Sequence, residues 1–516
     1  MKKNYHRVIL KGLIAIVCVI LILGFVYRDS TANKNYEQQL LYSSFDNQRI
    51  NAFCCDDKQY IFLPGFLNED DIELSNALKK VDNLQIIRSS DIPAVFISTA
   101  SGNLDRIYEN QENKETAKIC VYNSDGTCDY AGKLKCLKGR GNYSWDNWDK
   151  KPFGLCFSTQ TSLLDLGSGY KYALIANASD ATLIRNDVAR DLEVAVGLKY
   201  SHTGRFVDLF INGDYMGDYY LIDSMEVGEN RINIHDMETQ MEDLLRGTHP
   251  GEFPVYETPL VKGWNIPELV SDISGGYLIE REFLGRYTVD YDKNSSCFTT
   301  DYEEHFLVKS PEYCSKEQIN YICGYINELE GAVRNPMGIN TLTGKSYLDY
   351  LDITSMAQKY VVEEFTKNYD AGVSSSYFYK DIDSVDSRLC AAPGWDYDMS
   401  LGNYLEWMDF SKTGAIGFIH NTDNSDASVW WEDLFEKREF SDITVDIYNR
   451  VLKPYVINEE IGRIDALAEM LKDSANMDYI RWKDMYDSLG YFPGDESEYE
   501  ELKTFMLDRI DFLDGE

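Results

Sequence analysis

The sequence predicts an α+β fold in which antiparallel sheets come first along the chain and helices dominate its last part. Strand-like runs follow one another between residues 92 and 222, and two of them flank Asn212-Gly213, a pair that favours a β-hairpin. Beyond Gly402 apolar residues recur at three and four positions instead, which is the helical period. Sheets and helices are therefore segregated along the chain, as in an α+β protein.

The same patterns predict the individual elements. Strands are expected from β-branched and aromatic runs bounded by turn residues, at 58–64, 94–97, 118–122, 130–138, 172–176, 205–211, 215–222, 275–280, 376–380 and 388–392. Helices are expected from apolar recurrence and capping residues, at 182–196, 353–365, 430–435, 442–455, 459–472 and 498–512. Internal repeats are not apparent, which argues against a solenoid.

Composition limits the class of protein. The chain has 516 residues, 44% of them apolar, which is enough for one large or two moderate folded domains. Its formal charge of -36 repels polyanions, so a general nucleic-acid or anionic-lipid surface is not expected. A site for phosphate must therefore be locally basic. We predict a small accessory β-rich module over 33–90 and the main domain over 91–516.

The N-terminus carries a membrane-targeting signal. Four basic residues precede or flank an uncharged apolar run over 12–27, and the run reaches back to Val8 if Lys11 snorkels. We expect a transmembrane helix with a cytoplasmic basic tail in residues 1–32 and the main domain outside the cytoplasm. The alternative is a cleaved signal peptide, with Ser30-Thr31-Ala32 as the small-residue cleavage site and a secreted product.

Cysteine and histidine usage gives little functional information. Eleven cysteines are present, and Cys18 lies in the apolar run. The other ten permit disulfides in an exported chain, but their pairing cannot be read from the sequence, and buried thiols are the alternative. No Cys-x-x-Cys pair occurs and the six histidines do not cluster, so a zinc site is not expected.

Two acidic motifs are the strongest sign of chemistry. Asp370 follows a predicted helix, two predicted strands come next, and the second of them leads into Trp395-Asp396-Tyr397-Asp398. Phosphoryl-transfer enzymes place a catalytic acid and a metal-binding acid in this order, and Mg²⁺ binds through one or two carboxylates plus phosphate oxygens. The alternative is a set of solvated turns in an acidic chain, although the bulky Trp395 in a loop with two acids indicates a loop held in place.

Basic residues that suit phosphate occur earlier in the chain. Lys138-Gly139-Arg140-Gly141-Asn142 is a glycine-punctuated basic loop, and Lys150-Lys151-Pro152 follows it; a tight turn beside a salt-bridged surface is the alternative. Arg185 lies in the first turn of a predicted helix, where it is either paired with an acid or used on a ligand. Glu280 ends a predicted strand and is a candidate partner for a phosphate-binding lysine, or else an exposed strand end.

Taken in order, these motifs resemble the spore-coat CotH kinase family of atypical, kinase-like proteins. The resemblance runs from about residue 92 to the C-terminus. It is carried by six motifs, which are Lys138–Trp145 with Lys150–Pro152, Ala176–Asp180 with Arg185-Asn186, Val207–Gly217, Gly275–Glu280, Asn368-Tyr369-Asp370 and Trp395–Asp398.

The resemblance implies a kinase-like domain that binds ATP with Mg²⁺ and transfers phosphate to Ser or Thr of a protein. It divides the main domain into a nucleotide-binding part to about 290, a metal and catalytic loop over 367–403 and a helical part over 404–516. Asp370 aligns with the acid proposed as catalytic, and Asp396 with the metal-binding acid, with Asp398 as a second metal ligand. Spore-coat members have Asn about five residues after the catalytic acid, where this chain has Ser374-Ser375-Ser376, so Ser375 is the candidate ligand there.

For the nucleotide the resemblance points to Arg140, Lys151, Arg185 and Glu280. The expected function is a membrane-tethered kinase of surface or secreted proteins, with no nucleic-acid partner. The alternative is a non-catalytic cell-surface binding or adhesion protein on the same scaffold, because a fold does not fix an activity. A glycosidase with paired carboxylates is a third interpretation, which nothing else in the chain supports.

Overall fold

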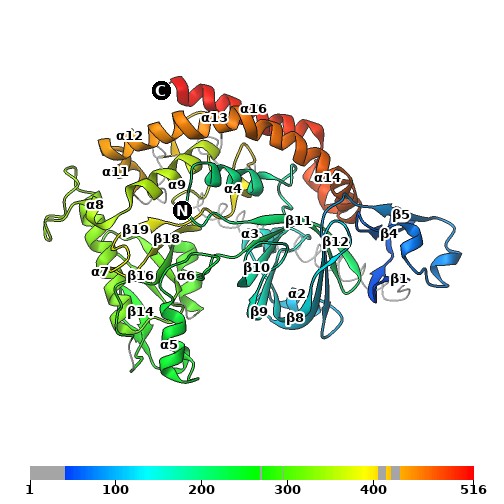
Figure 1. Ribbon diagram of the computed structural model, residues 1–516, viewed down its shortest axis with the longest axis horizontal. Coiled ribbons are helices and arrows are strands. Elements are labelled where there is room, and N and C mark those ends of the chain that lie inside the picture. Colours follow the sequence, from blue (N-terminus) through cyan, green and yellow to red (C-terminus); the bar gives the residue numbers. More distant parts are fainter. Residues whose placement is uncertain (1–40, 268–269, 294–295, 405–413, 420–429, 516) are drawn as a thin grey trace, which may run out of the picture. The chain divides into compact units, whose positions relative to one another are not determined.

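The computed structural model describes residues 41–267, 270–293, 296–404, 414–419 and 430–515 (Figure 1). It has mixed α+β architecture, with antiparallel sheets followed by a helical C-terminal part, as the sequence predicts. Within these ranges no helix is both long and apolar enough to cross a membrane. The predicted anchor over 8–27 lies outside the described residues.

The described residues divide into two compact units, one formed by 41–62 with 69–87 and the other by 63–68 with the described residues from 88 onward. In the first unit β1 (Tyr42–Phe45) and β2 (Gln48–Asn51) form a hairpin. The strands β3 (Phe53–Cys55), β4 (Lys58–Leu63) and β5 (Leu84–Arg88) form a three-stranded sheet.

A closed barrel begins the second unit. Its strands are ordered β10-β12-β11-β6-β7-β8-β9. They span β6 (Ala94–Thr99), β7 (Glu115–Tyr122), β8 (Cys128–Gly139), β9 (Phe153–Thr161), β10 (Gly169–Ile175), β11 (Gly204–Ile211) and β12 (Asp214–Asp223). Alternate apolar residues such as Val95, Ile97 and Leu209 fill one core. The predicted hairpin at Asn212-Gly213 is confirmed as β11 and β12, and Cys136 and Cys156, which face each other on β8 and β9, form a disulfide.

A seven-stranded antiparallel sheet follows, in the order β13-β14-β16-β17-β15-β18-β19. Its strands are β13 (Val255–Glu257), β14 (Val261–Trp264), β15 (Tyr277–Glu282), β16 (Cys297–Thr299), β17 (His305–Ser310), β18 (Ser376–Lys380) and β19 (Leu389–Ala391). The bounds predicted for the strand at 376–380 are confirmed. Because β15 lies between β17 and β18, its Glu280 is brought beside residues that are far away in the sequence.

Helices pack against these sheets (Figure 1). Those before residue 404 are α2 (Asp105–Glu109), α3 (Tyr143–Asn147), α4 (Arg185–Ala195), α5 (Met237–Leu245), α6 (Leu284–Asp292), α7 (Lys316–Val333), α8 (Tyr347–Tyr350) and α9 (Ile353–Thr366). Those after it are α11 (Trp431–Phe435), α12 (Arg438–Ile447), α13 (Lys453–Tyr455), α14 (Ile461–Arg481), α15 (Lys483–Leu489) and α16 (Glu496–Gly515).

The helices differ from the sequence prediction in two places. The separate helices expected at 442–455 and 459–472 are one helical run, because π-helical turns at Tyr448–Leu452 and Val456–Glu460 carry the backbone past Pro454. The helix expected at 182–196 begins instead at Arg185. Its first turn is delayed because Leu183 adopts a left-handed conformation, with φ +64°.

Helix α14 joins the C-terminal part to the barrel. The indole N–H of Trp482, which follows α14, donates to the carbonyl of Met216 at 2.7 Å, and Nε of Arg481 donates to the carbonyl of Tyr215 at 2.7 Å. Lys150 and Asp478 form an ion pair of 2.8 Å in which both side chains are fully buried. These contacts fix the barrel against the helices that pack on α9 and α4.

Candidate active site around Asp396

The loop after β19 carries Asp396 in an unusual backbone conformation. Its φ of 61° and ψ of 60° lie in the left-handed region, which Asp tolerates better than most residues other than glycine. Oδ2 of Asp396 accepts a hydrogen bond from Oγ of Ser375 at 3.3 Å. The guanidinium of Arg140 stacks over the ring of the adjacent Trp395, 5.1 Å from its centroid. Three predicted site residues from distant parts of the sequence are therefore brought together.

The charges in this cluster influence one another. Burial raises the pKa of Asp396, the Glu280 carboxylate raises it further, and the Arg140 guanidinium opposes both effects. Burial raises the pKa of Asp398 to about 7, with the charge of Asp396 as the next cause. Burial lowers the pKa of Arg140, while Asp396, Tyr377 and Asp398 act in the opposite direction. Strongly perturbed carboxylates beside a specific cation are typical of functional sites.

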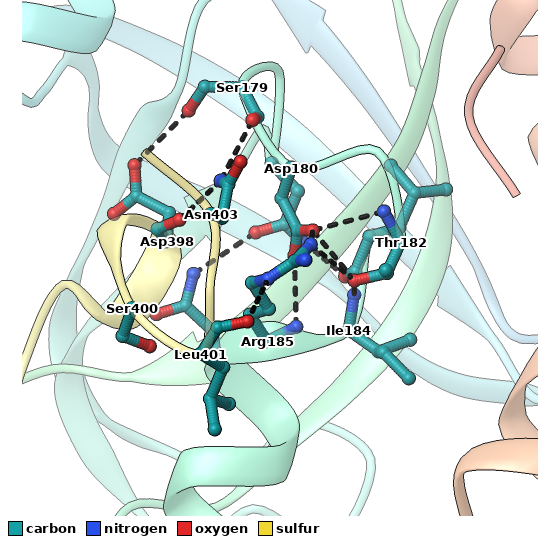
Figure 2. Close-up of polar contacts among 12 residues, drawn as sticks. Ser179, Asp180, Thr182, Ile184, Arg185, Asp398, Ser400, Leu401 and Asn403 are labelled. Carbon is teal, nitrogen blue, oxygen red and sulfur yellow. Dashed lines mark hydrogen bonds and ion pairs between the residues drawn. The ribbon is translucent and has the colours of Figure 1, made fainter. Parts of the chain in front are cut away.

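Asp398 is held by the turn that precedes α4 (Figure 2). Oγ of Ser179 donates to Oδ2 of Asp398 at 3.3 Å. The amide of Asn403 donates both to the carbonyl of Asp398, at 2.6 Å, and to the carbonyl of Ser179, at 3.0 Å. Asp398 thus sits between the turn before α4 and the chain leading out of the loop.

Arg185 takes the first of the two roles left open by the sequence. Its guanidinium forms an ion pair with Asp180 and also donates to the carbonyl of Leu401 at 3.4 Å (Figure 2). Asp180 is fully buried and accepts from the backbone N–H groups of Thr182, at 3.0 Å, and Arg185, at 2.9 Å. Asp180 therefore accepts the first backbone N–H of α4, whereas the N-cap residue itself, Ile184, makes no side-chain capping hydrogen bond.

Glu280 forms an ion pair with a lysine of the neighbouring strand β17. Nζ of Lys309, on β17, lies 3.0 Å from Oε2 of Glu280. Glu280 is buried, and it is opposite Tyr377 of β18 in the strand register. Glu280 and Lys309 thus extend the cluster around Asp396 across two strands.

Residues 137–513, more than half of the chain, match the protein family described as "CotH kinase protein". The chain belongs to the CotH kinase family. The predicted resemblance is thereby confirmed, and membership suggests a kinase-like function. A search of curated proteins found no match. Every predicted site residue falls within the segment that matches the CotH family.

Asp370 lies in the turn between α9 and β18. Its carbonyl accepts hydrogen bonds from the N–H groups of Val373, at 2.9 Å, and Ser374, at 3.1 Å, so the segment from 370 to 374 is tightly turned. Its own N–H donates to Oδ1 of Asn368 at 3.2 Å. The same turn delivers Ser375 to Asp396, which links the two acidic motifs of the CotH resemblance.

The lysines of the Lys-Lys-Pro step are placed elsewhere. Nζ of Lys151 donates to the carbonyl of Trp145 and lies 5.6 Å from the centroid of that residue's ring. Burial lowers the pKa of Lys151, and the acids that oppose this are Asp149 and Asp146. Lys150 is in the buried ion pair with Asp478. Among the described residues, neither lysine has a contact with Asp396 or Asp398.

Several residues of the site were missed by sequence reasoning. Oγ of Ser374 donates to Oε2 of Glu282 at 2.7 Å, and burial, followed by the charge of Glu280, raises the pKa of Glu282 to about 9. The strand period contained this signal, because residues two apart on a strand point to the same face, as Glu280 and Glu282 do. Lys309 carried no such signal, and Ser179 was named only within the Ala176–Asp180 motif, since only the tertiary fold brings these two residues to the site.

The side chains around Asp396 supply oxygen donors of the kind that bind Mg²⁺. Across the described ranges, no three or more His, Cys, Asp or Glu side chains are grouped so that they could hold a metal ion by themselves. Asp396, Asp398 and the Ser375 hydroxyl provide hard oxygen donors, which Mg²⁺ prefers. Because Mg²⁺ ordinarily completes its shell with phosphate oxygens and water, this donor set fits a metal that arrives with a nucleotide rather than a resident one.

Proposed function

We propose that this protein is an atypical kinase that transfers the γ-phosphate of ATP to Ser or Thr of surface or secreted proteins, with Mg²⁺. The observation that carries the proposal is the convergence of Arg140, Ser375 and Asp396 from three separate segments. Such a site pairs a cation for phosphate with oxygen donors for a metal. Membership of the CotH kinase family supports the same reading.

Each residue of the proposed site has a role that its chemistry allows. Asp396 and Asp398, with the Ser375 hydroxyl, would hold Mg²⁺, which supplies charge neutralisation for the phosphates. Asp370 would orient the substrate hydroxyl and accept its proton. Arg140 and Lys309 would bind phosphate oxygens, and Glu280 would orient Lys309. We leave Lys151 and Arg185 out of the nucleotide site, because Lys151 donates to the Trp145 carbonyl and Arg185 is buried in its ion pair with Asp180, whereas Lys309 is 40% exposed beside Glu280.

A non-catalytic binding protein is the second candidate, and one observation favours it. The hydroxyls of Ser374 and Ser375 replace the family's amide, and they donate to Glu282 and Asp396. A neutral hydroxyl is a weaker ligand for Mg²⁺ than the amide oxygen that it replaces. Under this alternative the scaffold would bind a surface partner through contacts that do not need Asp370.

The test is a transfer assay on the purified full-length protein. It is incubated with γ-labelled ATP and Mg²⁺ together with a mixture of extracellular proteins, and both nucleotide binding and label transfer are measured. Asp370→Asn should retain nucleotide binding but lower transfer by about 100-fold or more, the usual contribution of a positioned acid or base. Asp396→Asn should lower both binding and transfer.

The matched control is Asp442→Asn, which makes the same chemical change at a side chain that is 68% exposed on α12. It should behave as wild type. Nucleotide binding without transfer in any protein mixture, unchanged in Asp370→Asn, would favour the binding protein. Absence of both binding and transfer in the wild type would refute the kinase proposal.

A further inference from the structure

We propose that Asn186 and Glu193 of α4 are positioning residues that hold Asp396 in place by binding the backbone on both sides of it. This inference rests on the proposed function, since it assigns the control of the same site to a helix that touches neither nucleotide nor metal. We call this pair the α4 clamp. It was not apparent in the sequence, because α4 and the Asp396 loop are about 200 residues apart.

The first contact of the clamp lies directly after Asp396. Oδ1 of Asn186 accepts a hydrogen bond from the backbone N–H of Tyr397 at 2.9 Å. The amide group of Asn186 is itself oriented, because its Nδ2 donates to Oδ1 of Asn177 at 3.2 Å. A fixed amide therefore receives the N–H of the peptide that joins Asp396 to Tyr397.

The second contact lies before Asp396. Oε1 of Glu193 accepts from the N–H of Gly394 at 2.6 Å and from the hydroxyl of Tyr397 at 3.0 Å. Glu193 is only 1% exposed, so these hydrogen bonds do not compete with water. A Cβ at Gly394 would lie 2.1 Å from the Tyr397 hydroxyl, so only glycine permits this arrangement. One carboxylate oxygen thus joins the two ends of the loop.

Helix geometry places the two side chains for this task. Residues seven positions apart on a helix are separated by two turns and lie on one face, so Asn186 and Glu193 both point at the loop. The helix cannot drift, because Val188 and Leu192 are fully buried in the core. Its start is fixed by Asp180, the residue whose turn also contacts Asp398 through Ser179.

The backbone conformation of Asp396 explains why hydrogen bonds on both sides of it are needed. A left-handed backbone is unfavourable for a residue with a Cβ, and it persists only where the surroundings enforce it. The α4 clamp binds the peptides on either side and makes no hydrogen bond to the Asp396 carboxylate. Its effect is therefore to aim that carboxylate while leaving it available to a metal, which is the behaviour of a positioning residue.

The test compares four variants of the full-length protein. Asn186→Ala and Glu193→Ala remove the two halves of the clamp, whereas Glu193→Gln keeps an oxygen that can accept from Gly394 and Tyr397. Val188→Ala is the matched control, because it opens a cavity on the core side of α4 and lowers stability without touching the loop. Two readouts are used, which are amide hydrogen exchange over 393–398 and the Mg²⁺ concentration that half-saturates ATP binding.

Loss of the clamp should accelerate exchange at the Tyr397 amide in Asn186→Ala, and at the Gly394 amide in Glu193→Ala. The Mg²⁺ requirement should rise about 10- to 100-fold in both variants, the range seen when residues that orient metal ligands are removed. Glu193→Gln should restore both readouts. Val188→Ala should melt at a lower temperature with an unchanged Mg²⁺ requirement.

The two proposals fail in different ways. If the wild type binds Mg²⁺ and ATP and neither alanine variant alters exchange or the Mg²⁺ requirement, the clamp is refuted and the kinase proposal stands. If the wild type binds no nucleotide, the kinase proposal is refuted. Hydrogen exchange then still tests whether Asn186 and Glu193 hold Asp396. Unchanged protection of the Gly394 and Tyr397 amides in the alanine variants would refute the clamp.

Discussion

Two buried acidic clusters of this protein look alike in composition but differ in construction. One surrounds Asp396, and the other lies where the barrel meets α14 and contains Asp208, Asp218 and Asp478 with Lys150. We call the second the junction cluster. Burial raises the pKa of carboxylates in both, that of Asp208 to about 8. A perturbed pKa alone therefore does not tell the site from the scaffold.

The difference lies in the backbone and in the partners. Junction acids sit on regular elements, and Asp478 accepts from the Asp218 N–H at 3.0 Å and pairs with Lys150 at 2.8 Å. Neither carboxylate oxygen of Asp218 has a hydrogen-bond partner among the described residues. The Asp396 loop instead has a strained backbone held from outside. Strain retained around an acid points to function, whereas acids on regular strands and helices, held together by an ion pair such as Lys150–Asp478, point to structure.

The comparison predicts that the largest stability effect comes from the junction. Lys150→Met keeps the apolar stem but leaves Asp478 buried without its cation, and this should cost about 3–5 kcal/mol of unfolding free energy. Urea denaturation measures it. The control is Lys483→Met, which breaks the exposed Lys483–Asp487 pair and should cost about 1 kcal/mol or less. Equal losses in the two variants would show that the junction cluster is not a structural lock.

Asp396→Asn should change stability little and phosphate transfer strongly, the reverse of the effect expected at the junction cluster. Asn adopts the left-handed backbone as readily as Asp, so the unfolding free energy should change by about 1 kcal/mol or less. Phosphate transfer should fall about 100-fold or more, because an electrostatic group at the reacting centre is lost. Parallel denaturation and transfer assays check this. A large stability loss with intact transfer would exchange the roles assigned to the two clusters.

The junction cluster should also make stability depend on pH. Because the pKa of Asp208 is raised to about 8 in the folded state, the folded protein keeps a proton that the unfolded chain releases near pH 4. Its contribution to stability is therefore full at low pH and is lost as pH rises toward 8, with a slope approaching about 1.4 kcal/mol per pH unit. Asp208→Asn should remove this slope in denaturation curves from pH 5 to 8. Wild type and variant with parallel pH profiles would argue against a proton on Asp208.

The smallest effect is expected where the turn before α4 touches the site. Ser179→Ala deletes the hydroxyl that donates to Asp398 at 3.3 Å, and a single hydrogen bond contributes about 1 kcal/mol. We expect a shift of that size in the Mg²⁺ dependence of ATP binding, with no loss of fold. Isothermal titration at several Mg²⁺ concentrations measures it, and a shift as large as that of Asp396→Asn would mean that Asp398 is the main metal ligand.

The sequence predicted what depends on local pattern. The β11–β12 hairpin follows from Asn212-Gly213 between two apolar runs, and β18 follows from the three consecutive aromatic residues Tyr377, Phe378 and Tyr379. The acids at 396 and 398 were found because they flank an aromatic residue in a short motif. These features need no knowledge of distant partners.

Tertiary pairing could not be predicted in the same way. Lys150 and Lys151 look equivalent in sequence, yet Lys150 forms an ion pair with Asp478, which lies on a helix 328 positions later. The start of α4 was predicted at residue 182 and lies at Arg185, because the left-handed backbone at Leu183 leaves no mark on the apolar pattern of the sequence. Asn186 was recognised only as part of a motif, since its partner Tyr397 is reached through the fold.

The central claim is that the cluster around Asp396 binds ATP together with Mg²⁺. Isothermal titration of the full-length protein with ATP, with and without Mg²⁺, tests it most directly when wild type and Asp396→Asn are compared. The wild type should bind ATP only when Mg²⁺ is present, and Asp396→Asn should lose this binding. Binding that is equal in the variant or independent of Mg²⁺, or no binding by the wild type, would contradict it.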